Sequence, residues 1–113
     1  MPYINFKTNA NLSETQIASI ESKAGKLISK LSGKDESQLM VSLDNATHMM
    51  FRGEDVPCMM IHMDVFGDPD KTELDDFFSS LCEFITLTTE IETNNIYMNV
   101  SPFYSWGAGG RYN

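Results

Sequence analysis

The sequence has few of the features that mark membrane, nucleic-acid-binding or metal-binding proteins. Its 113 residues contain no apolar run of about 18, the length that a membrane-spanning helix needs. Only 8 Lys and Arg stand against 16 Asp and Glu, for a net charge of −8. This balance argues against nucleic acid as a partner, because phosphate binding needs clustered cations. The two Cys and two isolated His predict neither a disulfide framework nor a zinc site.

The N-terminus has no charged segment followed by an apolar one, which would mark a secretory signal. We therefore expect a cytoplasmic location, with secretion by a leaderless route as the open alternative, and no membrane partner. Hydrophobic residues make up 42% of the chain, enough to bury a core. The length suits a single domain over residues 1–113.

The first half of the chain has the pattern strand, helix, strand. Residues 3–8 alternate apolar and polar side chains, as a strand does. Ser13 and Gln16 form a capping box, and Gly33 is expected to end the helix in a left-handed cap. Residues 39–43 predict the second strand. The apolar stripe of the helix is Ile17, Ile20, Ala24, Leu27, Ile28 and Leu31.

The pattern begins again about 56 residues later. Residues 58–66 form an apolar run typical of a buried strand, and Gly67 breaks it. Asp68 and Pro69 are expected to be the N-cap and first residue of a second helix. Residues 96–100 predict the closing strand. The second helical stripe is Leu74, Phe77, Phe78, Leu81, Phe84 and Ile85.

Two β-α-β units of this kind predict an α+β fold. Each unit gives parallel strands with a right-handed crossover, so the two together give a four-stranded sheet with two helices on one face. The strands carry apolar residues on both sides, which predicts that the uncovered face associates with copies of the chain. Short strands near residues 49–51 and at the C-terminus are expected to extend neighbouring sheets.

Pro2 directly follows the initiator Met, which methionine aminopeptidase generally removes before a small residue. The product begins with a secondary amine. In an apolar pocket the charged form is disfavoured, so the pKa of the amine falls below the ordinary 7.7–8.0 of a chain terminus. A neutral amine can take a proton from a carbon next to a carbonyl. By position alone, Pro2 would be interpreted as an ordinary second residue.

Short motifs occur in order over nearly the whole chain. They are Met1-Pro2, Thr8-Asn9, Ser32-Gly33-Lys34, Met50-Phe51-x-Gly53, Pro57-Cys58, Phe66-Gly67, Asn95-Ile96-Tyr97-Met98-Asn99 and Trp106-Gly107. In these motifs the chain resembles the macrophage migration inhibitory factor family, which includes D-dopachrome tautomerase. The resemblance implies a homotrimer around a central channel. It also implies keto–enol tautomerisation of phenylpyruvate-like or dopachrome-like compounds, with no cofactor and no metal.

Carried over by position, the resemblance implies a site built from six residues. Pro2 matches the catalytic base, and Lys34 matches the lysine that holds the substrate carboxylate. The substrate-binding positions are completed by Phe66 through its backbone, Tyr97 and Asn99 from the neighbouring subunit, and Trp106 in the pocket wall. Without the resemblance, Lys34 would be an ordinary cation at a helix end.

The same holds for the other positions: Tyr97 and Asn99 alternate with Ile96 and Met98, so they would be a polar strand face. Trp106 alone would be a core residue.

The chain departs from the family pattern at three places. Its C-x-x-C position has Ile61 as the last residue, so two-cysteine exchange starting from Cys58 is excluded. Gln38 stands near the position of a pocket tyrosine, and residues 107–113 differ from the usual tail. These changes bear on substrate preference more than on fold.

Two other functions stay open from the sequence. The chain could be a non-catalytic, cytokine-like protein whose partner is a cell-surface receptor. A reaction such as dehalogenation or hydration is a third option, which would need additional Arg and Glu in the pocket, and only Arg52 and Arg111 are candidates. His48 and His62 are interpreted as ordinary structural residues, because neither has a carboxylate or Cys partner evident in the sequence.

Overall fold

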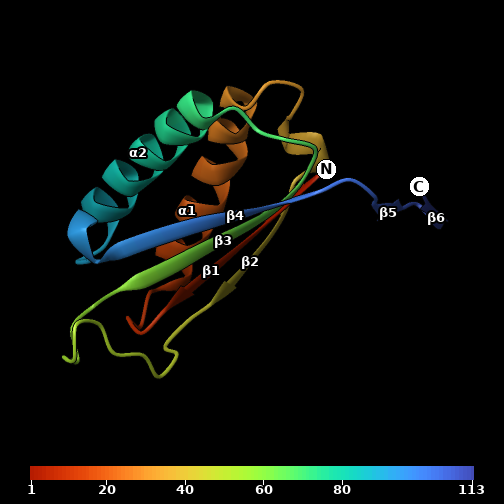
Figure 1. Cartoon of the computed structure of the whole chain (residues 1–113). Coiled ribbons are helices and arrows are strands. Elements are labelled where there is room, and N and C mark those ends of the chain that lie inside the picture. Colours follow the sequence, from red (N-terminus) through yellow and green to blue (C-terminus); the bar gives the residue numbers. More distant parts are fainter.

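The computed structural model describes residues 1–113 and contains a four-stranded sheet with both helices on one of its faces (Figure 1). Its elements are β1 (Pro2–Thr8), α1 (Glu14–Leu27), β2 (Met40–Asp44), β3 (Met59–Phe66), α2 (Lys71–Thr88) and β4 (Ile96–Phe103). The strand order is β2-β1-β3-β4. β1 is parallel to β2 and β3 is parallel to β4, while β1 and β3 are antiparallel. The predicted α+β fold of two β-α-β units is confirmed.

Helix α1 begins as the sequence predicts and ends earlier. Ser13 accepts a hydrogen bond from the backbone N–H of Gln16, whose side chain accepts one from the N–H of Ser13, so the capping box is formed. The α-helix ends at Leu27 and continues as a 3-10 turn over Ile28–Lys30. Gly33 has a φ of 77° but lies in the turn beyond the helix. The prediction that Gly33 ends the helix was therefore wrong.

Helix α2 begins two residues later than predicted. Asp70, and not Asp68, is the N-cap, because its side chain accepts from the N–H of Glu73. The residues that precede Asp70 are held by contacts with the end of β4. The N–H of Gly67 donates to the carbonyl of Phe103 at 2.7 Å, and the Tyr104 hydroxyl donates to Asp68. These contacts hold residues 67–68 at the end of β4, so α2 is capped by Asp70.

The core lies between the sheet and the two helices. Alternate residues of β1 and β3 point into it, as strand geometry requires, and the helices contribute the apolar stripes read from the sequence. Its largest fully buried side chains are Ile4, Phe6, Ile20, Ile28, Leu31, Met59, Ile61, Met63, Phe77, Leu81, Ile85 and Ile91. The buried Thr8 donates its hydroxyl to the carbonyl of Cys58 at 2.7 Å. The core thus fixes β1 against β3 and, with it, the position of Pro2.

The opposite face of the sheet is uncovered and mostly polar. The sequence predicted apolar residues on both faces of the sheet. This prediction was wrong for much of the uncovered face, where many side chains are polar and hydrogen-bond to one another. Tyr3 and Asn5 of β1 both reach Ser42 of β2, and Lys7 lies 3.8 Å from Asp44. The face also carries Met40, Met60, His62, Asp64, Phe66, Tyr97, Asn99, Ser101 and Phe103.

The C-terminal segment leaves the sheet and forms a hairpin of its own. Strands β5 (Gly107–Ala108) and β6 (Arg111–Tyr112) pair only with each other, beyond the end of β4 (Figure 1). The short strand expected near residues 49–51 is a single bridge between Phe51 and Glu54. Neither helix has the length and apolar character needed to cross a lipid bilayer.

Candidate active site

A hollow of about 530 Å³ lies at the N-terminal end of β1. It is lined by Met1, Pro2, Tyr3, Gln38, Met40, Trp106, Gly107, Ala108 and Gly109. Pro2 is buried, and its register partner on β3 is Val65. Of the six residues predicted for the site, Pro2 and Trp106 therefore meet in this hollow. Gln38, which the sequence marked as a departure, lies there too.

The backbone around Pro2 is held by two contacts of Met1. The carbonyl of Met1 accepts a hydrogen bond from the N–H of Phe66 at 3.3 Å, and the amine of Met1 donates to Oε1 of Gln38 at 3.1 Å. Desolvation lowers the pKa of this amine, the charge of Lys34 lowers it further, and Asp35 opposes the shift. An amine at this end of β1 therefore lies in surroundings that favour its neutral form.

Lys34 lines a second, smaller hollow of about 360 Å³ together with Phe66. The Lys34 ammonium donates to the backbone carbonyl of Phe66 at 2.9 Å. The turn that carries Lys34 is closed by a bond from its N–H to the carbonyl of Leu31 at 3.0 Å. Since Phe66 contacts both Met1 and Lys34, the predicted cation stands beside the predicted base. An incoming carboxylate could replace the Phe66 carbonyl as the acceptor for Lys34.

Trp106 is positioned by the C-terminal hairpin. Its N–H and carbonyl exchange hydrogen bonds with Asn113 at 3.0 and 3.1 Å. The indole packs edge-on against the ring of Phe103, with ring centroids 6.1 Å apart. The half-buried Trp106 thus forms an apolar wall of the hollow and is not a core residue. Sequence pattern did not single out Phe103, and it predicted a short C-terminal strand that extends a neighbouring sheet, not this hairpin.

Tyr97 and Asn99 lie elsewhere in the same chain. Tyr97 is in register with Met60, five positions along β3 from the Val65 that pairs with Pro2. At the rise of a strand this separation is roughly 17 Å. The ring of Tyr97 packs edge-on against Phe51 at 5.1 Å between centroids. One chain alone therefore does not bring Tyr97 or Asn99 to Pro2.

The two arginines considered for other chemistry also lie outside the hollow at Pro2. Arg52 lies over the ring of Phe51, 4.6 Å from the ring centroid, and donates to the carbonyl of Asn94 at 3.3 Å. Arg111 is exposed on β6. Neither residue lines the cavity with Pro2 or the one with Lys34.

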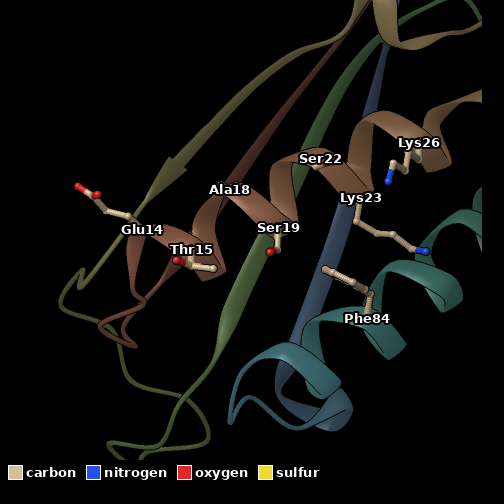
Figure 2. A pocket seen from close by; sticks show the side chains of 8 residues that line it. All are labelled: Glu14, Thr15, Ala18, Ser19, Ser22, Lys23, Lys26 and Phe84. Carbon is tan, nitrogen blue, oxygen red and sulfur yellow. The ribbon is translucent and has the colours of Figure 1, made fainter.

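A hollow larger than either of these two shares no lining residue with them. It has about 600 Å³ and lies open to solvent on the outer side of α1. Figure 2 shows its lining of mostly polar and charged side chains along α1, with Phe84 contributed by α2. The ammonium of Lys23 lies 5.4 Å from the centre of the Phe84 ring. None of the predicted site residues lines this hollow, so the volume of a hollow alone does not identify the active site.

The fold and the hollow at the chain start define the class of protein. A mixed sheet of two β-α-β units with a buried proline as second residue is the architecture expected of tautomerase-like proteins. Residues 1–111 match the family profile described as Macrophage migration inhibitory factor (MIF), so the chain belongs to the macrophage migration inhibitory factor family. Membership supports a tautomerase-like or cytokine-like function at the level of the family.

Solved structures agree with this assignment. MIF2 of Leishmania major has a TM-score of 0.91 at 18% identity, covering 100% of this chain and 97% of that one. A MIF-like protein of Entamoeba histolytica has a TM-score of 0.88 at 20% identity, covering 99% and 98%. Pt0534, inactivated by 2-oxo-3-pentynoate, has a TM-score of 0.84 at 17% identity, covering 96% and 92%. At these identities the likeness shows the fold alone. No curated protein matches by sequence.

Proposed function

We propose that the chain is a cofactor-independent tautomerase acting on phenylpyruvate-like or dopachrome-like compounds. The amine of Pro2, freed by removal of Met1, is the general base. The observation that carries the proposal is the meeting of a buried Pro2, the wall residue Trp106 and the cation Lys34 at one end of the sheet. With Met1 in place the nitrogen of Pro2 is a tertiary amide, which is not basic, so the proposal requires the shortened chain.

The reaction needs only proton transfer. The neutral Pro2 amine takes a proton from the carbon beside the substrate carbonyl, and the C–H electron pair becomes the enolate. The resulting ammonium returns the proton to the enolate oxygen, so the amine is regenerated and nothing is oxidised or reduced. Desolvation and the charge of Lys34 lower the pKa of the Met1 amine against the opposing charge of Asp35, which supports a Pro2 amine that loses its proton more readily than an ordinary terminus.

Lys34 is the proposed anchor for the substrate carboxylate. It is a local cation on a chain of net charge −8, so the anion is attracted by the pocket and not by the surface as a whole. In the proposal the substrate carboxylate takes the place of the Phe66 carbonyl, and the backbone of Phe66 stays beside the reacting carbon. Trp106 supplies an apolar surface for an aromatic ring.

The complete site is proposed to form in a homotrimer with a central channel. Tyr97 and Asn99 are far from Pro2 in their own chain, so they can contribute only to a neighbour's site. The polar uncovered face fits the wall of a water-filled channel better than a dry interface. The C-terminal hairpin, which pairs with no strand of its own sheet, is free to meet another subunit.

The test is turnover of phenylpyruvate by Met-free protein, with the N-terminal mass measured on the same sample. Pro2→Gly is expected to lose most of the activity. A matched control inserts Ala between Met1 and Pro2, so that the nitrogen of Pro2 stays acylated after Met removal. This control is expected to be inactive. Equal rates for the three proteins would remove the proposal.

A chemical label tests the same nitrogen. The structural neighbour Pt0534 is described as inactivated by 2-oxo-3-pentynoate. A free secondary amine can add to the alkyne of this keto acid, so we expect one adduct on the N-terminal peptide of the Met-free chain. The chain with inserted Ala is expected to stay unmodified at that peptide.

The alternative is a cytokine-like protein that binds a cell-surface receptor without catalysis. The exposed C-terminal segment favours it, because Tyr104 and Tyr112 are 68% and 66% exposed there. A natural protein that retains Met1, and receptor binding that survives Pro2→Gly, would support this function against the enzyme.

A further inference from the structure

Three polar side chains form a connected group on the uncovered face of the sheet. His62 of β3 is in register with Asn99 of β4, and Asp64 lies two residues further along β3 on the same face. Nε2 of His62 lies 2.7 Å from Oδ1 of Asp64. Nδ1 of His62 is hydrogen-bonded to Oδ1 of Asn99. Both nitrogens of the ring are therefore engaged. The sequence interpretation of His62 as a residue without a carboxylate partner was wrong.

The partners of the ring decide where its protons are. An ionised carboxylate only accepts hydrogen bonds, so Nε2 carries a proton. With the oxygen of the Asn99 amide toward the ring, Nδ1 carries a proton as well, and the ring in this arrangement is an imidazolium. The hydrogen bond with Asn99 raises the pKa of His62, desolvation opposes the shift, and Asp64 raises it further. In this state Asn99 turns its oxygen to the ring and its NH₂ group away from it.

None of the other charged or titratable groups of this face hydrogen-bonds to His62. They are Tyr3 and Lys7 of β1, Asp44 of β2 and Tyr97 of β4. Lys7 pairs with Asp44, and Tyr3 hydrogen-bonds to Ser42. Asn5, in register with His62 on β1, donates to Ser42 and Asp44. Asp64 is thus the carboxylate in contact with the imidazole, and Asn99 its remaining partner.

We propose that Asp64 and His62 are positioning residues that set which end of the Asn99 amide faces away from the ring. When the ring is protonated, Asn99 presents its NH₂ donors. When the ring is neutral, Asp64 keeps the proton on Nε2, and the bare Nδ1 needs a donor. The amide of Asn99 already contacts Nδ1, and its NH₂ group supplies this donor when the amide turns over and presents its oxygen.

This inference rests on the proposed function, in which Asn99 enters the pocket of a neighbouring subunit. There the protonated state offers a donor to a substrate oxygen, and the neutral state offers an acceptor. The affinity for such a substrate is therefore expected to fall as the pH rises through the pKa of His62. The protonation of His62 in one subunit thus affects the substrate preference of the site in the neighbouring subunit.

The direct test is ¹⁵N NMR of the Met-free protein labelled in His and Asn, titrated from acidic to alkaline pH without substrate. His48, exposed in the loop before β3, provides the second ring signal, and His48→Gln assigns it. We expect Nδ1 of His62 to lose its proton while Nε2 keeps it, with the Asn99 NH₂ signals shifting at the same midpoint. An Asn99 signal that is constant through this midpoint, or a neutral ring protonated at Nδ1, overturns the inference.

Variants extend the test to catalysis. Asp64→Asn is expected to lower the midpoint of His62 and to abolish its Nε2–H preference. His62→Gln is expected to raise the KM for phenylpyruvate about five-fold, the factor of one lost hydrogen bond, with kcat little changed and the pH dependence of KM lost. His48→Gln is expected to change neither. A His62→Gln protein with unchanged KM at every pH overturns the inference.

The two proposals fail in different ways. A coupled titration of His62 and Asn99 in a protein without tautomerase activity overturns only the proposed function. An active enzyme whose His62 and Asn99 titrate independently overturns only the inference.

Discussion

Glu73 at the start of α2 holds Ser32 with both of its carboxylate oxygens. Oε1 accepts from the backbone N–H of Ser32 at 2.9 Å, and Oε2 accepts from its hydroxyl at 2.6 Å. The next residue is Gly33, whose φ of 77° turns the chain, and Lys34 follows. The contact therefore fixes the turn that carries the proposed substrate anchor to a helix of the other β-α-β unit.

Weakening the contact between Glu73 and Ser32 is expected to affect substrate binding more than the chemical step. In Glu73→Gln the NH₂ group can only donate to the Ser32 hydroxyl, so one of the two contacts is reversed and both lose the negative charge that strengthens them. We expect a KM for phenylpyruvate raised several-fold, kcat changed less than two-fold, and a stability loss of about 1 kcal/mol. Steady-state kinetics and urea denaturation measure the three quantities. Glu83→Gln, an exposed position on the same helix, is the control and is expected to be neutral.

Loss of the Lys34 charge is expected to weaken binding of keto acids more strongly. A hydrogen bond to a charged group contributes about 1.5–3 kcal/mol, so Lys34→Ala should raise KM on the order of ten-fold or more. Lys30→Ala, an exposed lysine in the preceding 3-10 turn, is the matched control. Equal KM values for the two variants would show that Lys34 does not hold the carboxylate.

The pH dependence of kcat/KM should report the amine of Pro2. Because its surroundings lower an amine pKa, the activity is expected to rise with pH through a midpoint below the ordinary 7.7–8.0 of a terminus. Lys34 lowers the pKa of the Met1 amine, so we expect Lys34→Gln to move the Pro2 midpoint to higher pH. Asp35 raises the pKa of the Met1 amine, so we expect Asp35→Asn to move the midpoint to lower pH. Shifts in the same direction for both variants would contradict the assignment.

The C-terminal hairpin is expected to be needed for assembly. Its strands pair with no strand of their own sheet, and it carries Trp106. Deleting residues 105–113 should weaken the trimer and remove tautomerase activity, as measured by light scattering and phenylpyruvate turnover. Tyr112→Phe, which keeps the hairpin but loses the bond to Ser105, is expected to remain trimeric. A truncated chain that stays fully trimeric would show that the contacts between subunits lie elsewhere.

The sequence predicted a helix end correctly where residues close together in the chain decide it. Ser13 and Gln16 satisfy each other, and the capping box formed where the sequence placed it. The start of α2 was predicted wrongly because Asp68 and Asp70 are both good caps. The choice between them is made by contacts with Phe103 and Tyr104, which are distant in sequence. A window of neighbouring residues contains no information on such contacts.

The candidate site was only partly readable for the same reason. Pro2, Lys34, Phe66 and Trp106 were named from motifs and lie at one end of the sheet. The residues that position them belong to no sequence motif. One example is Glu73, which accepts hydrogen bonds from Ser32 in the turn before Lys34. The uncovered face shows the limit most clearly. Alternation placed Tyr97 and Asn99 on one side of β4, but nothing in a single strand reveals that His62 on β3 contacts Asn99.

The two chain ends approach the same hollow, Pro2 from β1 and Trp106 through the C-terminal hairpin. An affinity tag left on either end would therefore alter the sample being assayed. An N-terminal tag converts the ring nitrogen into an amide, and a C-terminal tag extends the very segment that is expected to contact another subunit. Recombinant work is best done on tagless protein, purified by its acidic charge, so that an inactive preparation can be traced to the molecule itself.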